Sequence, residues 1–139
     1  MVKLVGGKEV DRFQTLLNPQ RRIPSSITRL TGISDDMVAD APLFAEVADH
    51  IASFTEDAVF VAHNVNFDYG FIKQEFARLE QPFRRPKMCT VREMRRTHPG
   101  LSSYSLANLT KHFHIDMEQH HRALSDAKAA AELLKLAFE

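Results

Sequence analysis

The sequence has 139 residues, no net formal charge and 44% hydrophobic residues, which is enough to form the core of one domain. The neutral charge gives no global sign of nucleic-acid binding, so any phosphate-binding surface must be local. Cys89 is the only cysteine, which excludes an intrachain disulfide. Without a signal peptide or a long apolar run, we expect a cytoplasmic protein that spans no membrane.

The first residues of the chain have the pattern of a β-hairpin. Apolar residues alternate around Lys3, Gly6 and Gly7 supply a turn, and residues 10–17 are rich in strand formers. Asn18 and a proline then end the second strand. The following residues, 20–32, are predicted as a loop.

Two helical segments are predicted next. Ser34 can cap a short helical turn through Val38, and Asp40 is the expected cap of a longer helix with Pro42 near its first position. Apolar residues at helical spacing define the expected buried face of the longer helix: Phe44, Val47, Ala48, Ile51 and Phe54.

A strand followed by a helix is predicted in the middle of the chain. Residues 59–62 are a short apolar run, typical of a strand covered on both faces. Asp68 falls in the first turn of the next helix, beside the carboxyl end of that strand, where α/β sheets bind ligands. The expected apolar stripe of this helix is Phe67, Phe71, Ile72, Phe76 and Leu79.

These polar residues also have a purely structural interpretation. A carboxylate such as Asp68 stabilises a helix N-terminus by a few tenths to about 1 kcal/mol. His63 and Asn64 can equally be turn residues that satisfy backbone groups. The pattern at this position alone does not decide between the two interpretations.

Another strand and helix are predicted beyond residue 86. Residues 87–89 are a short strand candidate, and Thr90 with Glu93 has the spacing of a capping box, which predicts a helix to about Thr97. Ser103 or Ser105 is expected to start the following helix.

The C-terminal part predicts a histidine-containing loop and a long helix. The loop holds His120 and His121, and Asp126 lies in the first turn of the helix. We expect this acidic helix start and that of Asp68 to converge on one metal-dependent site. Zinc is disfavoured, because a structural zinc site needs four closely spaced ligands. The expected buried stripe of the helix is Ala127, Ala130, Ala131, Leu134 and Phe138.

Arginines and lysines form three local clusters that are candidate phosphate-binding patches. A solvated surface explains each of them equally well. The clusters are Arg21 with Arg22, Arg84 with Arg85 and Lys87, and Arg92 with Arg95 and Arg96.

Three segments, in this order, resemble the DEDD-type 3′–5′ exonucleases of the histidine subclass. This is the family of the proofreading epsilon subunit of bacterial DNA polymerase III. Residues 63–71, HNVNFDYGF, resemble its second motif, and residues 121–127, HRALSDA, resemble its third. Residues 23–44 resemble the segment between its first and second motifs. The resemblance therefore runs nearly from end to end.

The resemblance implies an α/β fold of the RNase H-like, three-layer type, with a mixed sheet flanked by helices and residues 1–139 in one domain. It implies hydrolysis of nucleic acid, DNA rather than RNA, from the 3′ end by a two-metal mechanism with Mg²⁺ or Mn²⁺. The implied roles are proofreading or repair. The implied partners are a nucleic acid with a free 3′ end and a polymerase or repair complex.

The family motifs also imply roles for individual residues. Asp68 and Asp126 would be the metal-binding carboxylates of the catalytic site, and His121 would be the general base. The residues implied to lie near the terminal nucleotide are His63, Asn64 and Phe67.

The sequence departs from the family at its first motif. That motif is Asp-x-Glu followed by Thr, and Asp-x-Glu-Thr occurs nowhere in this chain. We therefore expect a chain that is incomplete at its N-terminus, lacks the first central strand, is impaired in activity and self-associates through the open sheet. The alternative is a non-catalytic remnant of the fold that binds nucleic acid or protein.

Overall fold

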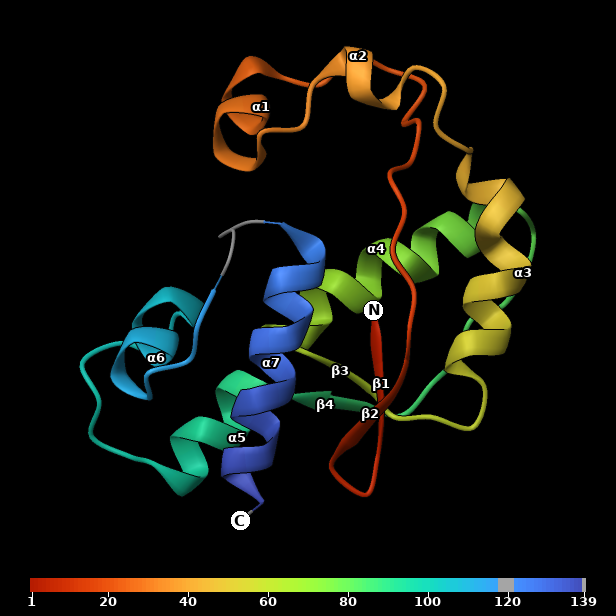
Figure 1. Ribbon diagram of the computed structural model, residues 1–139. Coiled ribbons are helices and arrows are strands. Elements are labelled where there is room, and N and C mark those ends of the chain that lie inside the picture. The colour runs from red at the N-terminus through yellow and green to blue at the C-terminus, as the bar shows by residue number, and fades with distance from the viewer. Residues whose placement is uncertain (118–121, 139) are drawn as a thin grey trace.

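The computed structural model describes residues 1–117 and 122–138 of the chain. Within these residues it contains seven helices and two small sheets of two strands each. Helix α7 (Ala123–Ala137) runs through the middle of the molecule and contacts strands of both sheets (Figure 1). Helices α5 and α6 lie along one side of α7, and α3 lies on the other (Figure 1).

The predicted N-terminal hairpin is present. Strand β1 (Val2–Val5) pairs with β2 (Lys8–Arg12) in antiparallel orientation. Gly6 and Gly7 join them with φ angles of 60° and 81°, a backbone that glycine adopts without steric cost. The second strand ends at Arg12 rather than at residue 17, and the next residue, Phe13, donates its backbone N–H to the Met1 carbonyl at 2.9 Å.

The second sheet is a short parallel pair joined by a helix. Strand β3 (Phe60–Ala62) pairs with β4 (Lys87–Cys89), and α4 (Val65–Arg78) is the crossover between them. In the described residues this pair does not join the hairpin into one sheet. The parts of the expected mixed α/β architecture are therefore present, but as an antiparallel and a parallel sheet that remain separate.

The predicted loop over residues 20–32 was wrong, because it contains helix α1 (Ser25–Thr31). Pro24 precedes the helix with a φ of −55°, which suits a helix start. Gly32 ends it in the left-handed conformation, and its N–H donates to the Thr28 carbonyl at 2.7 Å. The helix is two turns long and has no buried residue, so it produces no apolar periodicity.

Helix α2 (Asp35–Val38) follows Ser34 as predicted, although the Ser34 side chain makes no capping bond. The next helix, α3 (Phe44–Thr55), starts later than predicted, and Asp40 does not cap it. The N-cap is Leu43, whose N–H donates to the carboxylate of Glu46 at 3.2 Å. The predicted stripe of α3 is confirmed, with its members buried or half-buried.

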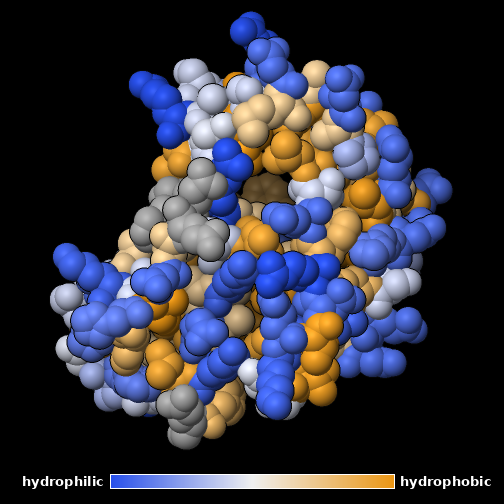
Figure 2. Space-filling view, viewed as in Figure 1, coloured by the Kyte–Doolittle hydropathy of each residue, from blue (hydrophilic) through white to orange (hydrophobic). Residues whose placement is uncertain are grey.

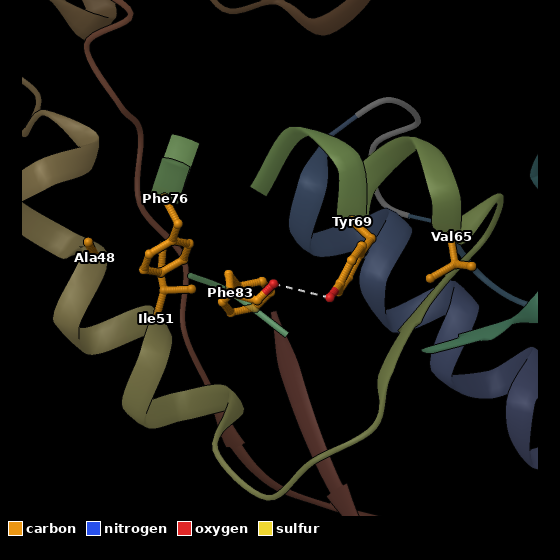
Figure 3. Packing of buried hydrophobic residues seen from close by; sticks show 6 residues of the cluster. All are labelled: Ala48, Ile51, Val65, Tyr69, Phe76 and Phe83. Carbon is orange, nitrogen blue, oxygen red and sulfur yellow. Dashed lines mark hydrogen bonds between the residues drawn. The ribbon is translucent and has the colours of Figure 1, made fainter. Parts of the chain in front are cut away.

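The main core forms between α3, α4 and the loop before β4. The rings of Phe76 and Phe83 stack with centroids 4.7 Å apart, and the Tyr69 hydroxyl donates to the Phe83 carbonyl at 3.3 Å (Figure 3). The predicted stripe of α4 is only partly confirmed. Phe67 and Phe71 are 68% and 55% exposed, and Tyr69 is buried in their place. The buried residues of this cluster are Ala48, Ile51, Val65, Tyr69, Phe76 and Phe83.

A second core forms between the last three helices, α5 (Thr90–Thr97), α6 (Leu106–His112) and α7. Of the two predicted starts, Ser105 rather than Ser103 caps α6, its hydroxyl accepting from the Asn108 N–H at 3.1 Å. The capping box at Thr90 was wrong, since Cys89 is the N-cap and Thr90 is inside the helix. The stripe of α7 was partly wrong: Phe138 is exposed, and the buried residues are Ala129, Ala130, Leu133 and Ala137.

Hydrophilic residues cover much of the face shown in Figure 2, which is hollowed between the α1–α2 segment and the start of α7. No helix in the described part of the chain is long and apolar enough to cross a membrane.

Candidate active site

Two acidic residues lie at the starts of two helices. Asp68 is in the first turn of α4, directly after β3, and Asp126 is in the first turn of α7. Burial and, second, the negative charge of Asp126 raise the pKa of Asp68. Helices α4 and α7 both contact β3, and the negative charge of Asp126 acts on Asp68.

The acidic pair matches the donor chemistry of Mg²⁺ or Mn²⁺. Mg²⁺ takes oxygen ligands and often uses one or two carboxylates together with substrate phosphates. Among the described residues, no group of three or more His, Cys, Asp or Glu side chains could hold a metal ion. Asp68 and Asp126 therefore provide a small donor set, from which we expect weak metal binding without substrate.

His63 follows β3, and both of its ring nitrogens are engaged. Nε2 lies 2.7 Å from the carbonyl oxygen of Tyr104, and Nδ1 lies 2.8 Å from the hydroxyl of Thr90. A carbonyl only accepts, so Nε2 donates, and in the neutral ring Nδ1 accepts from the fully buried Thr90 hydroxyl. His63 thus fastens the end of β3 to α5 and to the segment before α6.

The charge of Asp126 also acts on this histidine. Burial lowers the pKa of His63, while the Tyr104 carbonyl and the charge of Asp126 act in the opposite direction. The end of β3 and the start of α7 therefore share one electrostatic environment. With both nitrogens occupied, His63 is better suited to positioning this region than to proton transfer.

The other two residues implied to contact substrate are accessible. Asn64 is the N-cap of α4 in the left-handed conformation, with a φ of 65° and no side-chain capping bond. It is exposed and lines a polar cavity of about 540 Å³. Phe67 is exposed one residue before Asp68, and its ring packs edge-on against Phe71 with centroids 4.9 Å apart. An exposed aromatic pair beside two carboxylates can stack on a base.

The predicted base His121 lies outside the described residues. The next residue, Arg122, connects the site to a distant helix, because its Nε donates to the Thr31 carbonyl at the end of α1. The partners are 91 positions apart, so no local pattern could have revealed this bond. Gly32 leaves room for the Arg122 guanidinium, since a Cβ at this position would lie 3.1 Å from Arg122 Nη2.

Comparison with known proteins identifies the family. The family model described as an exonuclease matches residues 1–134, which is almost the whole chain. The chain belongs to this exonuclease family. The resemblance to DEDD-type exonucleases is therefore confirmed.

Two relatives in this exonuclease family are DNA polymerases III of the PolC type. The chain is 42% identical to the protein from Clostridium perfringens over 138 residues, which is 99% of this chain and 10% of that protein. It is 43% identical to that from Caldanaerobacter subterraneus over 132 residues, or 95% of this chain and 9% of that protein. The chain thus spans about a tenth of the length of these relatives.

A solved structure of an exonuclease shares the fold. It is Exonuclease X in complex with 5′ overhanging duplex DNA, with a TM-score of 0.76 and 28% sequence identity. The match covers 99% of this chain and 78% of that one. An exonuclease of RNase H-like fold is therefore structurally similar to almost every part of the chain, and the predicted fold class is confirmed.

Proposed function

We propose that the chain is the core of a 3′–5′ exonuclease domain that hydrolyses DNA rather than RNA in proofreading or repair. The observation that carries this proposal is that Asp68 and Asp126 lie in the first turns of α4 and α7, two helices that both contact β3. A 5′ overhang, such as the DNA bound to Exonuclease X, has a recessed 3′ end, the kind of end on which this activity would act. The PolC-type relatives support a polymerase context.

In this proposal, each site residue has a separate role at the 3′ end of the substrate. Asp68 and Asp126 would hold divalent ions, Mg²⁺ or Mn²⁺, which when bound stabilise charge on the attacking and leaving oxygens. His121 would accept the proton of the attacking water as general base. Phe67 would stack on the terminal base, and Asn64 would contact the same nucleotide.

We further propose that these 139 residues alone have little activity. The described donors beside the site are one acidic pair, and the Asp-x-Glu-Thr motif is absent from the sequence. Electrostatic stabilisation of the transition state depends on fixed geometry, which two carboxylates define less completely than four. This small donor set also favours the second candidate function, a non-catalytic domain that binds nucleic acid or a protein.

A nuclease assay tests the proposal. Single strands labelled at the 3′ or the 5′ end are incubated with excess protein and Mn²⁺ or Mg²⁺. We expect slow release of mononucleotides from the 3′ end, lost in Asp126→Asn and reduced in His121→Ala. Release from the 5′ end, or 3′ release unchanged in Asp126→Asn, would contradict the proposal. Strand binding with no release in either metal would leave the non-catalytic function as the correct one.

A further inference from the structure

A second polar site lies beside the acidic pair. It is the cavity of about 540 Å³ between α5 and residues 101–105. Asn64 borders it, and Asp68 follows in the first turn of the helix that Asn64 caps. The polar residues of its lining are Asn64, Arg95, Ser102, Ser103, Tyr104 and Ser105.

The charge of this lining is positive. None of the lining residues is acidic, and Arg95 makes no ion pair with any carboxylate in the part of the chain that the structure describes. Its guanidinium instead lies over the Tyr104 ring, 5.3 Å from the centroid. The neighbouring Arg96 differs, because it pairs with Glu93 at 2.7 Å. Arg95 therefore presents an uncompensated charge to the cavity.

Arg85, from the cluster with Arg84 and Lys87, binds other parts of the protein instead of facing a cavity. Arg85 donates to the carbonyls of Ala52 and Thr55 at the end of α3, at 3.1 and 3.0 Å. Its guanidinium also lies over the Phe83 ring. Arg85 is thus half-buried and bonded to α3, whereas Arg95 is exposed at a cavity wall.

The wall facing Arg95 is fixed before any ligand binds. The Tyr104 hydroxyl donates to the His98 carbonyl at 2.7 Å, and the Tyr104 carbonyl accepts from His63. The Asn108 amide donates to the Ser103 carbonyl at 2.8 Å. The Ser103 hydroxyl donates to that of Ser105, which caps α6. Because these bonds hold the wall, the Ser102 hydroxyl and the guanidinium can meet a ligand with little loss of conformational entropy.

The hydrogen-bond donors of the cavity lining indicate which kind of ligand it binds. A guanidinium, a hydroxyl group and an amide, with no carboxylate in the lining itself, suit the oxygens of a phosphate. We infer that this cavity binds a non-scissile backbone phosphate of the nucleic-acid strand whose 3′ end lies at Asp68 and Asp126. The inference rests on the proposed function and adds a second contact point for its substrate, which would set the path of the strand.

Strand binding tests the inference directly. A 5′-fluorescein-labelled DNA 12-mer is titrated with protein in EDTA, where no cleavage occurs, and fluorescence anisotropy is measured over a range of salt concentrations. We expect Arg95→Gln to weaken binding about 5- to 30-fold and to reduce the salt slope by about 0.7, the value for one phosphate on a single strand. Arg95→Lys keeps the charge but not the two parallel N–H donors of the guanidinium, and it should lose less affinity than Arg95→Gln.

Arg96→Gln is the matched control, because it removes the same charge from the adjacent position of α5. It should change the affinity no more than about twofold. Circular dichroism melting of each variant shows whether the fold is kept. If Arg95→Gln and Arg96→Gln weaken binding equally while the wild-type chain binds well, the phosphate site is wrong and the proposed function stands. A wild-type chain that binds no strand would overturn both.

Single methylphosphonate linkages, which are uncharged, locate the phosphate. We expect the wild-type chain to lose affinity at one internal linkage, and Arg95→Gln to be insensitive to that substitution. Competition with inorganic phosphate and with a deoxynucleoside monophosphate separates the two sources of a phosphate group. Arg95-dependent binding of the monophosphate, with no internal linkage affecting strand affinity, would assign the cavity to the product and overturn the inference.

Discussion

The imidazole of His63 bonds to residues 27 and 41 positions away, Thr90 and Tyr104. The sequence marked His63 as a site or turn residue but could not identify its partners, because neither lies in the same local pattern. Asp68 and Asp126 were easier to predict, since each follows from the start of one helix. The side chains that hold a site together are therefore harder to predict than those at the ends of its elements.

We predict that His63→Ala lowers the free energy of unfolding by about 1–3 kcal/mol, because it leaves the buried hydroxyl of Thr90 without its acceptor. Urea denaturation measures this loss. Thr90→Val provides the matched variant, since it removes the same bond from the other side with little change of shape. The double variant should lose less free energy of unfolding than the two single variants lose in total. Strict additivity would mean that this bond contributes nothing.

The same histidine predicts a pH dependence. Burial lowers the pKa of His63 in the folded state, so the unfolded chain binds the proton more readily. Stability from this residue is present above the unfolded pKa of about 6.5 and is lost as the pH falls towards the lower folded pKa. Urea titrations between pH 7.5 and 5 should show this loss in the wild-type chain and a flatter profile in His63→Ala. Parallel profiles would contradict the assignment.

Asp68 predicts a gain of stability on neutralisation. Burial and the charge of Asp126 raise its pKa, so its carboxylate is less favourable in the folded than in the unfolded state at neutral pH. Asp68→Asn should therefore stabilise the metal-free chain, by only about 0.5 kcal/mol because the side chain is partly buried and solvent screens its repulsion from Asp126. Asp36→Asn, at an exposed position of α2, is the control. Added Mn²⁺ should stabilise the wild-type chain and not Asp68→Asn.

Among the elements, apolar periodicity predicted α3 and the existence of α4 and α7, because these helices are long enough to repeat a pattern. It failed for α1, whose two turns bury no residue. It also misassigned one face of α4, since Phe67 and Phe71 are exposed beside the acidic pair. Periodicity detects an apolar face but cannot distinguish a face that packs on a core from one that stacks on a ligand.

The contact of α1 with the start of α7 predicts the effect of Gly32→Ala. Gly32 has a φ of 76°, and a Cβ there would meet Arg122 at 3.1 Å. The left-handed backbone alone should cost about 1–2 kcal/mol. Displacing Arg122 should add to this and weaken Mn²⁺ binding, because Arg122 is the N-cap of the helix that holds Asp126.

Gly100→Ala is the control for this prediction. Its φ is 88°, and nothing lies within 4 Å of an added Cβ, so it has the backbone penalty without the clash. Denaturation and Mn²⁺ titration of the two variants separate the effects. If both lose equal stability and keep Mn²⁺ affinity, the bond between Arg122 and α1 does not position α7.

At the scale of the whole molecule, the hairpin and the parallel pair both contact α7 without pairing with each other in the described residues. Apolar patterning could not have shown this separation, because it identifies strands but not which strands are neighbours in a sheet. Strand β1 pairs with β2 and β3 with β4, each in a two-stranded sheet. Among residues 1–117 and 122–138, each sheet therefore keeps edges with backbone groups that no neighbouring strand satisfies.

These open edges predict self-association of the chain. An unpaired N–H or carbonyl that becomes buried costs about 1–3 kcal/mol, and an exposed edge is a template for pairing with another chain. We expect dimers or larger species in sedimentation at low micromolar concentration, together with fast hydrogen exchange in β1. Val5→Lys adds a charge at an exposed apolar residue of the hairpin and should shift the chain towards monomer. Ile27→Lys, a similar change on α1 away from both sheets, should leave association unchanged. A wild-type monomer with a strongly protected hairpin would show that the two sheets satisfy their edges without a partner.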